Sequence, residues 1–139
     1  MTTCNAHVYM YYRMSSKQAH KMQILVADDH ALMREGLSNL LSGKEGLEVC
    51  AEAKNGIEAV RLAGQLHPNV ILMDVSMPEL DGIEATTLIK KNHPEISIIA
   101  LSMHDSDAMK QKMLAAGAST YINKEAASAE LMLAIRKVK

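Results

Sequence analysis

Carboxylate, hydroxyl and ammonium side chains stand at the ends of four short apolar runs in this sequence. They are Asp28, Asp29, Asp74, Ser102 and Lys124. If these groups meet, the three carboxylates repel one another, and a hard divalent cation relieves that repulsion. Mg²⁺ suits such oxygen ligands and usually retains waters. A carboxylate that stays partly free can attack phosphorus while the ammonium neutralises the phosphoryl oxygens. The residue types therefore indicate phosphoryl transfer to an aspartate.

The elements that would position these side chains alternate regularly from Met22 onward. Short apolar runs, typical of buried strands, are separated by segments with apolar residues at helical spacing. The spacing predicts strands over 24–27, 47–53, 70–73, 96–101 and 121–122, and helices over 31–41, 55–66, 81–93, 105–116 and about 127–139. The second strand alternates apolar and polar residues and is expected at an edge. The pattern favours an α/β fold with a doubly wound parallel sheet.

Ligands of an open parallel sheet bind beyond the carboxyl ends of its strands. Four of the five predicted strands deliver chemistry-bearing side chains to that same edge. The two similar sequences NGIEA (55–59) and DGIEA (81–85) lie at predicted helix starts. Each has Asn or Asp followed three residues later by Glu, the pattern of an N-terminal cap.

Composition limits the classes of protein that this chain can be. It has 139 residues, 48% hydrophobic and 22% charged, ordinary values for one globular domain. A formal net charge of −1 argues against a strongly basic nucleic-acid surface. No apolar run approaches the roughly 18 residues of a spanning helix or forms a secretory signal. With only Cys4 and Cys50 present, we expect a cytoplasmic protein with no membrane partner.

Five segments, taken in this order along the chain, resemble the receiver domains of two-component response regulators, particularly the NarL/FixJ (LuxR-type) branch. They are LVADDH (25–30), VILMDVSMPELDG (70–82), ALSMH (100–104), AGA (116–118) and YINKE (121–125). The resemblance covers residues 22–139. It implies a flavodoxin-like (βα)5 fold with strand order 2-1-3-4-5.

The resemblance also implies a role for each matching position. Asp74 is the expected phosphoacceptor, with Lys124 pairing with the phosphoryl group and Ser102 moving to hydrogen-bond it. For Mg²⁺, the expected ligands are side chains of Asp29 and Asp74, the main-chain carbonyl of Ser76, and Asp28 through a water. Tyr121 would change rotamer with Ser102. Ser76 and His104 would tune the lifetime of the phosphorylated state.

Other interpretations remain open for single residues and for the whole chain. Asp28 and Asp29 could be helix caps, and Tyr121 could be a core residue. A second hypothesis is an aspartyl phosphatase of the haloacid-dehalogenase type, but that type has a second Asp two residues after the nucleophile, where this sequence has Ser76. A third hypothesis is an unphosphorylated interaction module.

The predicted function is a signalling switch, with no enzyme activity beyond its own phosphorylation and dephosphorylation. A histidine kinase would phosphorylate Asp74 in a Mg²⁺-dependent step. The readout would be a phosphorylation-dependent homodimer, through the last two helices or the first and last. Residues 1–21 are expected to be a poorly ordered tail. DNA contact would need a helix-turn-helix domain that is absent from residues 22–139.

Overall fold

The computed structural model describes residues 21–103 and 106–138, leaving aside the side chains of residues 126 and 127. The predicted tail therefore falls almost entirely outside the described residues. The elements in chain order are β1 (Met22–Ala27), α2 (Ala31–Ser42), β2 (Leu47–Ala53), α3 (Gly56–Leu66), β3 (Val70–Asp74), α4 (Gly82–Asn92), β4 (Ser97–Ser102), α5 (Asp107–Ala116), β5 (Thr120–Asn123), the 3-10 turn η1 (Lys124–Ala126) and α6 (Ala127–Lys137).

The five strands form one parallel sheet in the order β2-β1-β3-β4-β5. This confirms the predicted α/β fold and its strand order. β1 and β3 lie side by side. From β1 the chain continues to β2 at one edge of the sheet, and from β3 it continues to β4 and β5 toward the other edge. A parallel sheet with this order has its switch point between those two strands, and ligand sites form there.

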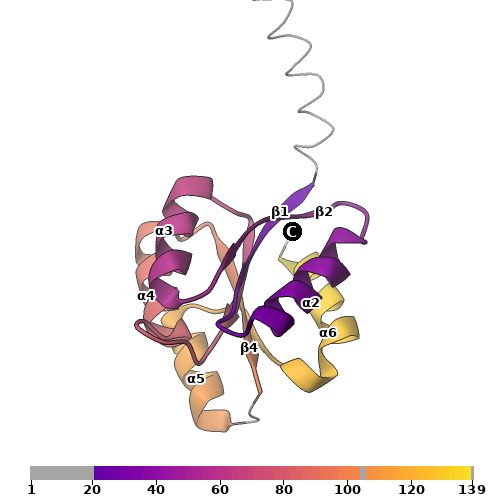
Figure 1. The fold of residues 1–139 in the computed structure, drawn as a ribbon. Helices are drawn as coiled ribbons and strands as arrows, with labels where there is room; N and C mark the ends of the chain where they lie inside the picture. Colours follow the sequence, from indigo (N-terminus) through magenta and orange to yellow (C-terminus); the bar gives the residue numbers. More distant parts are fainter. Residues whose placement is uncertain (1–20, 104–105, 139) are drawn as a thin grey trace, which may run out of the picture.

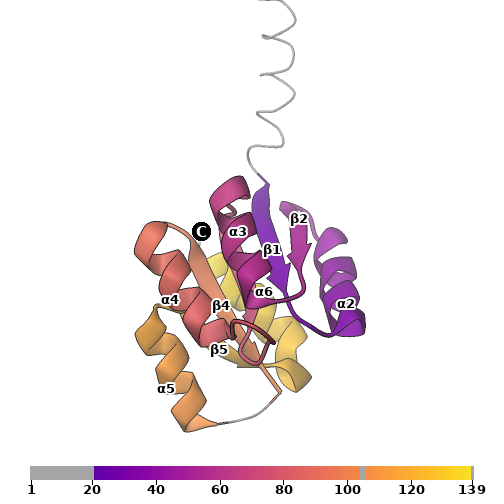
Figure 2. The same cartoon turned by 60° about the vertical axis from the view of Figure 1, so that its left-hand side comes forward.

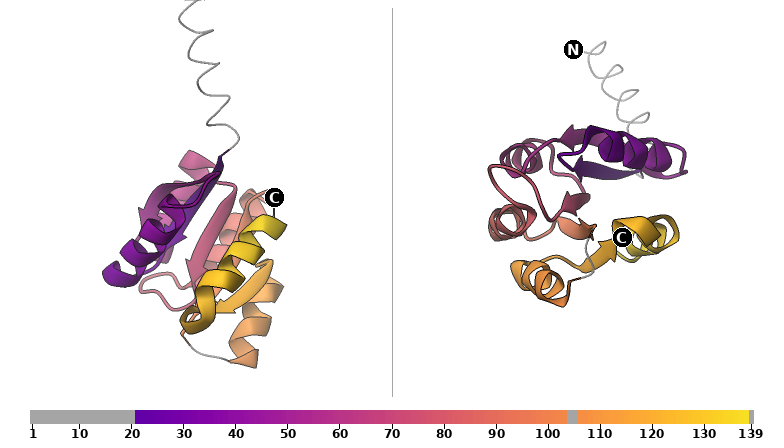
Figure 3. Two further views of the ribbon diagram at one scale, coloured as in Figure 1. Left: turned by 90° about the vertical axis from the view of Figure 1, so that its right-hand side faces the viewer. Right: turned by 60° about the horizontal axis from the view of Figure 1, so that its bottom comes forward.

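Helices cover both faces of the sheet, with α3, α4 and α5 on one side and α2 and α6 on the other (Figure 1). Successive strand residues alternate between the two cores, as the pleat requires. In β3, Ile71 and Met73 pack toward α3–α5, whereas Val70 and Leu72 pack toward α2 and α6. Further views show the sheet between the same two helical layers (Figure 3).

β2 is the edge strand, as its alternating sequence predicts, but its alternation of burial is weak. Val49, Cys50 and Ala51 are all half-buried. The reason is that both faces of β2 are covered, by α2 and by α3. The Cys50 thiol also donates a hydrogen bond to the Ile24 carbonyl at 3.5 Å. The register between β1 and β2 shifts after Ile24.

The predicted helix caps are present in the structure. The Asn55 side chain accepts a hydrogen bond from the Glu58 backbone N–H at 2.7 Å, and Asp81 accepts one from Glu84 at 2.9 Å. α5 begins later than the expected residue 105, because Ser106 caps it by accepting from the Met109 N–H at 3.3 Å. The last helix ends at Lys137 rather than residue 139.

Candidate functional site

The site lies at the carboxyl ends of the strands, where the arrowheads of β1 and β2 point in Figure 2. Asp28 directly follows β1, Asp74 is the last residue of β3, Ser102 is the last residue of β4, and Lys124 directly follows β5. All four residues are buried. The strand-end argument therefore predicted correctly that these residues share one edge of the sheet.

Lys124 bridges two of the carboxylates. Its Nζ lies 2.6 Å from Asp28 Oδ2 and 3.2 Å from Asp74 Oδ1. The Lys124 and Asp28 side chains are only 2% and 1% exposed, and that of Asp74 is 6% exposed. One ammonium group thus faces two buried carboxylates, and the pocket keeps an excess of negative charge.

Asp29 and His30 form the more open side of the pocket. The Asp29 side chain is 28% exposed and the His30 side chain is 70% exposed. His30 Nδ1 lies 3.1 Å from Asp29 Oδ1 and 3.3 Å from Asp28 Oδ1. One ligand atom each from Asp28, Asp29, His30 and Asp74 lie within 4.8 Å of one another. The structure therefore brings all three predicted carboxylates together, and adds His30 to them.

Burial raises the pKa of Asp74 from its ordinary value of 3.8 to about 7. The charge of Lys124 opposes this increase, while the negative charge of Asp28 adds to it. Desolvation disfavours the charged carboxylate, and a like charge nearby does the same. The charged form of the Asp74 carboxylate is thus disfavoured, and a nearby cation would stabilise it.

The backbone behind Asp74 is tightly fixed. The Val75 N–H donates to the Leu101 carbonyl at 3.1 Å, and the Gly82 N–H donates to the Val75 carbonyl at 2.8 Å. A Cβ at Gly82 would lie 2.1 Å from the Asp74 carbonyl oxygen. Only glycine lets the start of α4 approach the end of β3 this closely, so α4 helps to fix the position of Asp74.

The sequence interpretation assigned no role to Arg34, which supports the other side of the pocket. Its Nη1 donates to the Asp28 carbonyl at 2.7 Å, and its Nε donates to Glu52 at 3.0 Å. Arg34 thus ties the loop after β1 to the edge strand β2. No sequence signal identifies this role, because Glu52 is 18 residues away and meets Arg34 only in the fold.

The remaining predicted residues lie around this pocket or outside the described chain. Ser102 is buried, and Ser76 is exposed. Tyr121 is half-buried and packs against the core under α3–α5. His104 lies outside the described residues. Neither Asp28 nor Asp29 is the N-cap of α2, which is His30, a residue whose side chain makes no capping hydrogen bond. Asp28 Oδ1 accepts a hydrogen bond from the His30 backbone N–H at 2.9 Å.

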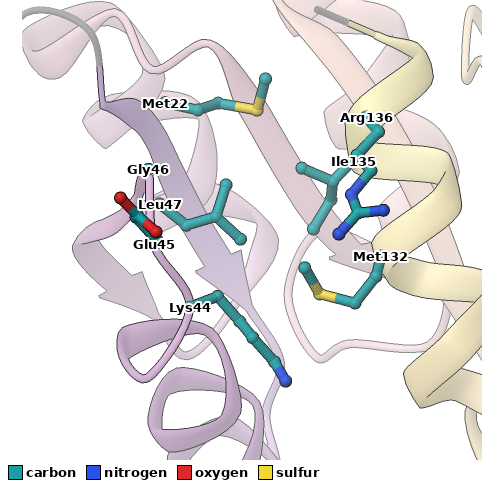
Figure 4. A pocket seen from close by; sticks show the side chains of 8 residues that line it. All are labelled: Met22, Lys44, Glu45, Gly46, Leu47, Met132, Ile135 and Arg136. Carbon is teal, nitrogen blue, oxygen red and sulfur yellow. The ribbon is translucent and has the colours of Figure 1, made fainter.

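A separate hollow of about 400 Å³ lies at the opposite end of the sheet (Figure 4). Its lining consists of Met22, Lys44, Glu45, Gly46, Leu47, Met132, Ile135 and Arg136. These residues come from the starts of β1 and β2, from the loop before β2, and from α6. None of them belongs to the acidic pocket, so this hollow is not part of the candidate site.

Among the residues that the structure describes, no helix is both long and apolar enough to cross a membrane.

Residues 24–136 match the family model for the response regulator receiver domain. The chain belongs to this family, and its function is that of a phosphoacceptor domain in two-component signalling. It is 40% identical to the response regulator GacA of Pseudomonas viridiflava over 117 residues, 84% of this chain and 55% of that protein. The transcriptional regulatory protein DegU of Brevibacillus brevis is 38% identical over 119 residues, 86% of this chain and 50% of that protein.

Solved structures agree with this family. The response regulator domain of Thermotoga maritima CheB superposes with a TM-score of 0.80 at 33% identity, covering 85% of this chain and 96% of that one. A LuxR-family response regulator from Aurantimonas sp. SI85-9A1 gives 0.81 at 36% identity, covering 85% and 84%. The chain spans about half the length of the curated relatives named above.

Proposed function

We propose that Asp74 is the phosphoacceptor of this domain and that Lys124 stabilises the phosphoryl group. The observation that supports this most directly is the ion-pair geometry, in which Lys124 Nζ lies 3.2 Å from Asp74 Oδ1 at the carboxyl ends of the strands. The buried ammonium group is already beside the oxygen that would bond phosphorus. It is also shared with Asp28, so it can shift between carboxylates as charge develops.

The acidic pocket fits a bound Mg²⁺. Its donor set includes three carboxylates, and burial, together with the charge of Asp28, raises the pKa of Asp74, so a bound cation would favour the charged carboxylate. Asp29 and Asp74 would hold the ion directly, with the Ser76 carbonyl, while Asp28 would act through a water. Bound Mg²⁺ would supply positive charge to the phosphoryl oxygens.

The chain's own residues then divide the remaining work. An Asp74 oxygen forms the new bond to phosphorus as the bond between phosphorus and the donor imidazole breaks, and the electron pair stays on that nitrogen. Lys124 turns from the carboxylates toward the phosphoryl oxygens. Ser102 donates a hydrogen bond to one of them. Tyr121, in the strand beside β4, follows Ser102 and transmits the change to α5 and its neighbours. Ser76 and His104, two residues after Asp74 and Ser102 in the sequence, would set the lifetime of the phosphorylated state.

Phosphorylation of Asp74 can be tested with phosphoramidate and Mg²⁺, using intact mass to count phosphoryl groups. We expect one acid-labile group on the wild type and none on Asp74→Asn. Asp81→Asn is the matched control, since it makes the same chemical change seven residues later and keeps an oxygen for the helix cap. A full phosphoryl group on Asp74→Asn would refute the assignment.

We further propose that a histidine kinase is the phosphodonor and docks on α2. A surface hollow of about 500 Å³ beside the pocket is lined by Leu32, Met33, Gly36, Leu37, Leu40, Lys124, Glu125 and Ser128. Leu32 is 85% exposed there. A protein that brings its phosphohistidine to Asp74 must cover this surface, because Lys124 belongs both to the hollow and to the site.

The docking proposal predicts that a change on α2 affects phosphorylation by a kinase and not phosphorylation by a small donor. We expect Leu32→Asp to slow phosphotransfer from a kinase about tenfold, the loss of one well-packed apolar anchor, and to leave phosphorylation by phosphoramidate unchanged. Leu133→Asp, at an exposed position on α6, is the control. Equal slowing by both variants would contradict docking on α2.

For the output, we propose transcriptional regulation in the cytoplasm through a phosphorylation-dependent homodimer. The likeness to GacA and DegU supports the transcriptional output, since the second of them is named a transcriptional regulatory protein. DNA contact would belong to a helix-turn-helix part, corresponding to the half of those relatives that this chain does not span. Sedimentation with and without phosphoramidate tests the dimer, and unchanged mass would contradict it.

A further inference from the structure

Two histidines and a glutamate meet at the end of the sheet opposite the acidic pocket. His67 follows α3, His93 follows α4, and Glu95 lies in the turn before β4. One ligand atom from each lies within 4.8 Å of the other two. These residues precede β3 and β4, whereas Asp74 and Ser102 end those strands, and the proposed function gives them no role.

The contact between the two helices makes this cluster. α3 and α4 lie side by side on the same face of the sheet (Figures 1 and 2). The two imidazole rings meet edge to face with their centres 5.1 Å apart, and His93 Nδ1 lies 3.9 Å from Glu95 Oε1. Gly64 of α3 lies beside the His93 ring, since a Cβ there would be in ordinary contact with His93 Nε2, at 3.7 Å.

The backbone already holds these residues in place. The His93 N–H donates to the Ile89 carbonyl at 2.7 Å, and Lys90 Nζ donates to the Pro94 and Ile96 carbonyls at 2.7 and 2.9 Å. His67 adopts a left-handed conformation with φ of 48°, which ends α3 and turns its side chain away from the helix path. Binding of a ligand at this cluster would therefore require little additional ordering of the backbone.

We propose that His67, His93 and Glu95 bind a divalent transition-metal ion of the Zn²⁺ class, with water completing its coordination. Imidazole nitrogens and a carboxylate oxygen are the ligands that Zn²⁺ takes in protein sites with an open position. Both histidines also stand at helix C-termini, where the partial negative charge favours a cation.

The ligand atoms, which lie within 4.8 Å of one another, need to move only slightly closer to bind one ion. Tetrahedral ligands at about 2.1 Å from Zn²⁺ lie about 3.4 Å apart, and the Glu95 side chain, which is 66% exposed, can rotate to reach that spacing. The bound ion would link the C-terminal ends of α3 and α4. This site does not depend on the assignment of Asp74.

The test is a Zn²⁺ titration of the full chain with ¹⁵N-labelled histidine, following the ring nitrogens. The sequence also contains His7, His20 and Cys4, so the readout must be residue-specific. We expect His67 and His93 to shift together in one binding event. His67→Asn, which tolerates the left-handed backbone, and Glu95→Gln should each weaken Zn²⁺ binding at these rings at least about tenfold.

Asp29→Asn, which alters the acidic pocket, is the control and should leave these shifts unchanged. Unaltered amide spectra of the variants would show that they fold. Two results would overturn the proposal. One is Zn²⁺ shifts confined to the other histidines, which are His7, His20, His30 and His104. The other is undiminished binding at His93 in both His67→Asn and Glu95→Gln.

Discussion

The two ends of the sheet use charge in opposite ways. At the carboxyl end, Asp28, Asp74 and Lys124 are buried against one another. At the amino end, the titratable side chains are exposed or half-buried, and Lys90 uses its ammonium group to hold the carbonyls of a turn. Buried carboxylates cost stability unless something compensates them, whereas a charge that satisfies backbone carbonyls stabilises a turn. The comparison teaches that charges at the carboxyl end are buried at a cost in stability, whereas the charge of Lys90 at the amino end stabilises a turn.

Two glycines make this comparison measurable, one at each end. A Cβ at Gly82 would lie 2.1 Å from the Asp74 carbonyl oxygen and 2.9 Å from Val75 Cα. Because backbone must move, we expect Gly82→Ala to lower the free energy of unfolding by about 3 kcal/mol. Urea denaturation measures the loss. The variant should also phosphorylate more slowly, since Asp74 moves with its backbone.

Gly64→Ala is the matched change at the amino end. Its Cβ would meet only the tip of the His93 ring, at an ordinary contact distance of 3.7 Å. Gly64 is exposed within α3, so alanine should stabilise the helix by about 0.5–1 kcal/mol. Equal losses in both variants would show that tight backbone packing is not special to the carboxyl end.

The sequence predicted the carboxyl end better than the amino end, for a physical reason. Asp28, Asp74 and Lys124 follow strands, and parallel strands bring their ends to one edge whatever the loops do. His67 and His93 follow helices, and their meeting depends on how α3 packs against α4. A single sequence carries little information on that packing. Arg34 escaped notice similarly, because its partners on the loop and on β2 come together only in the fold.

The next largest effect concerns the charge on Asp74. Its folded-state pKa is about 7, against an ordinary value of 3.8. The folded protein therefore binds more protons than the unfolded chain between these values, and stability falls as pH rises from about 4 to about 7. At pH 8 with a chelator present, we expect Asp74→Asn to be more stable than the wild type by on the order of 2 kcal/mol. Denaturation across this pH range measures it.

The control for this prediction is Asp107→Asn, which neutralises an exposed carboxylate at the start of α5. It should change stability by a few tenths of a kcal/mol. Added Mg²⁺ should stabilise the wild type and not Asp74→Asn, which reduces or reverses their difference. If the stability of the wild type instead rose from pH 4 to pH 7, and if that rise were absent in Asp74→Asn, the result would contradict a raised pKa of Asp74.

The smallest expected effect compares the two ends of one helix. At the start of α4, Asp81 accepts a hydrogen bond from the Glu84 N–H at 2.9 Å. At its other end, Lys90 donates to two carbonyls of the following turn. We expect Asp81→Ala to cost about 1 kcal/mol, the usual loss of an N-cap, and Lys90→Met to cost about as much by removing hydrogen bonds from a charged donor.

Amide hydrogen exchange separates these two changes even if their stabilities match. Fraying the start of α4 in Asp81→Ala should speed exchange at Gly82, whose N–H donates to the carbonyl of Val75, the residue after Asp74. Lys90→Met should speed exchange at Ile96 instead, because that N–H belongs to the turn that Lys90 closes. Asp81→Asn keeps an oxygen acceptor and should exchange as the wild type does. If Lys90→Met exposed Gly82 as strongly as Asp81→Ala does, α4 would open as one unit, and the acidic pocket would depend on the turn at the far end of the sheet.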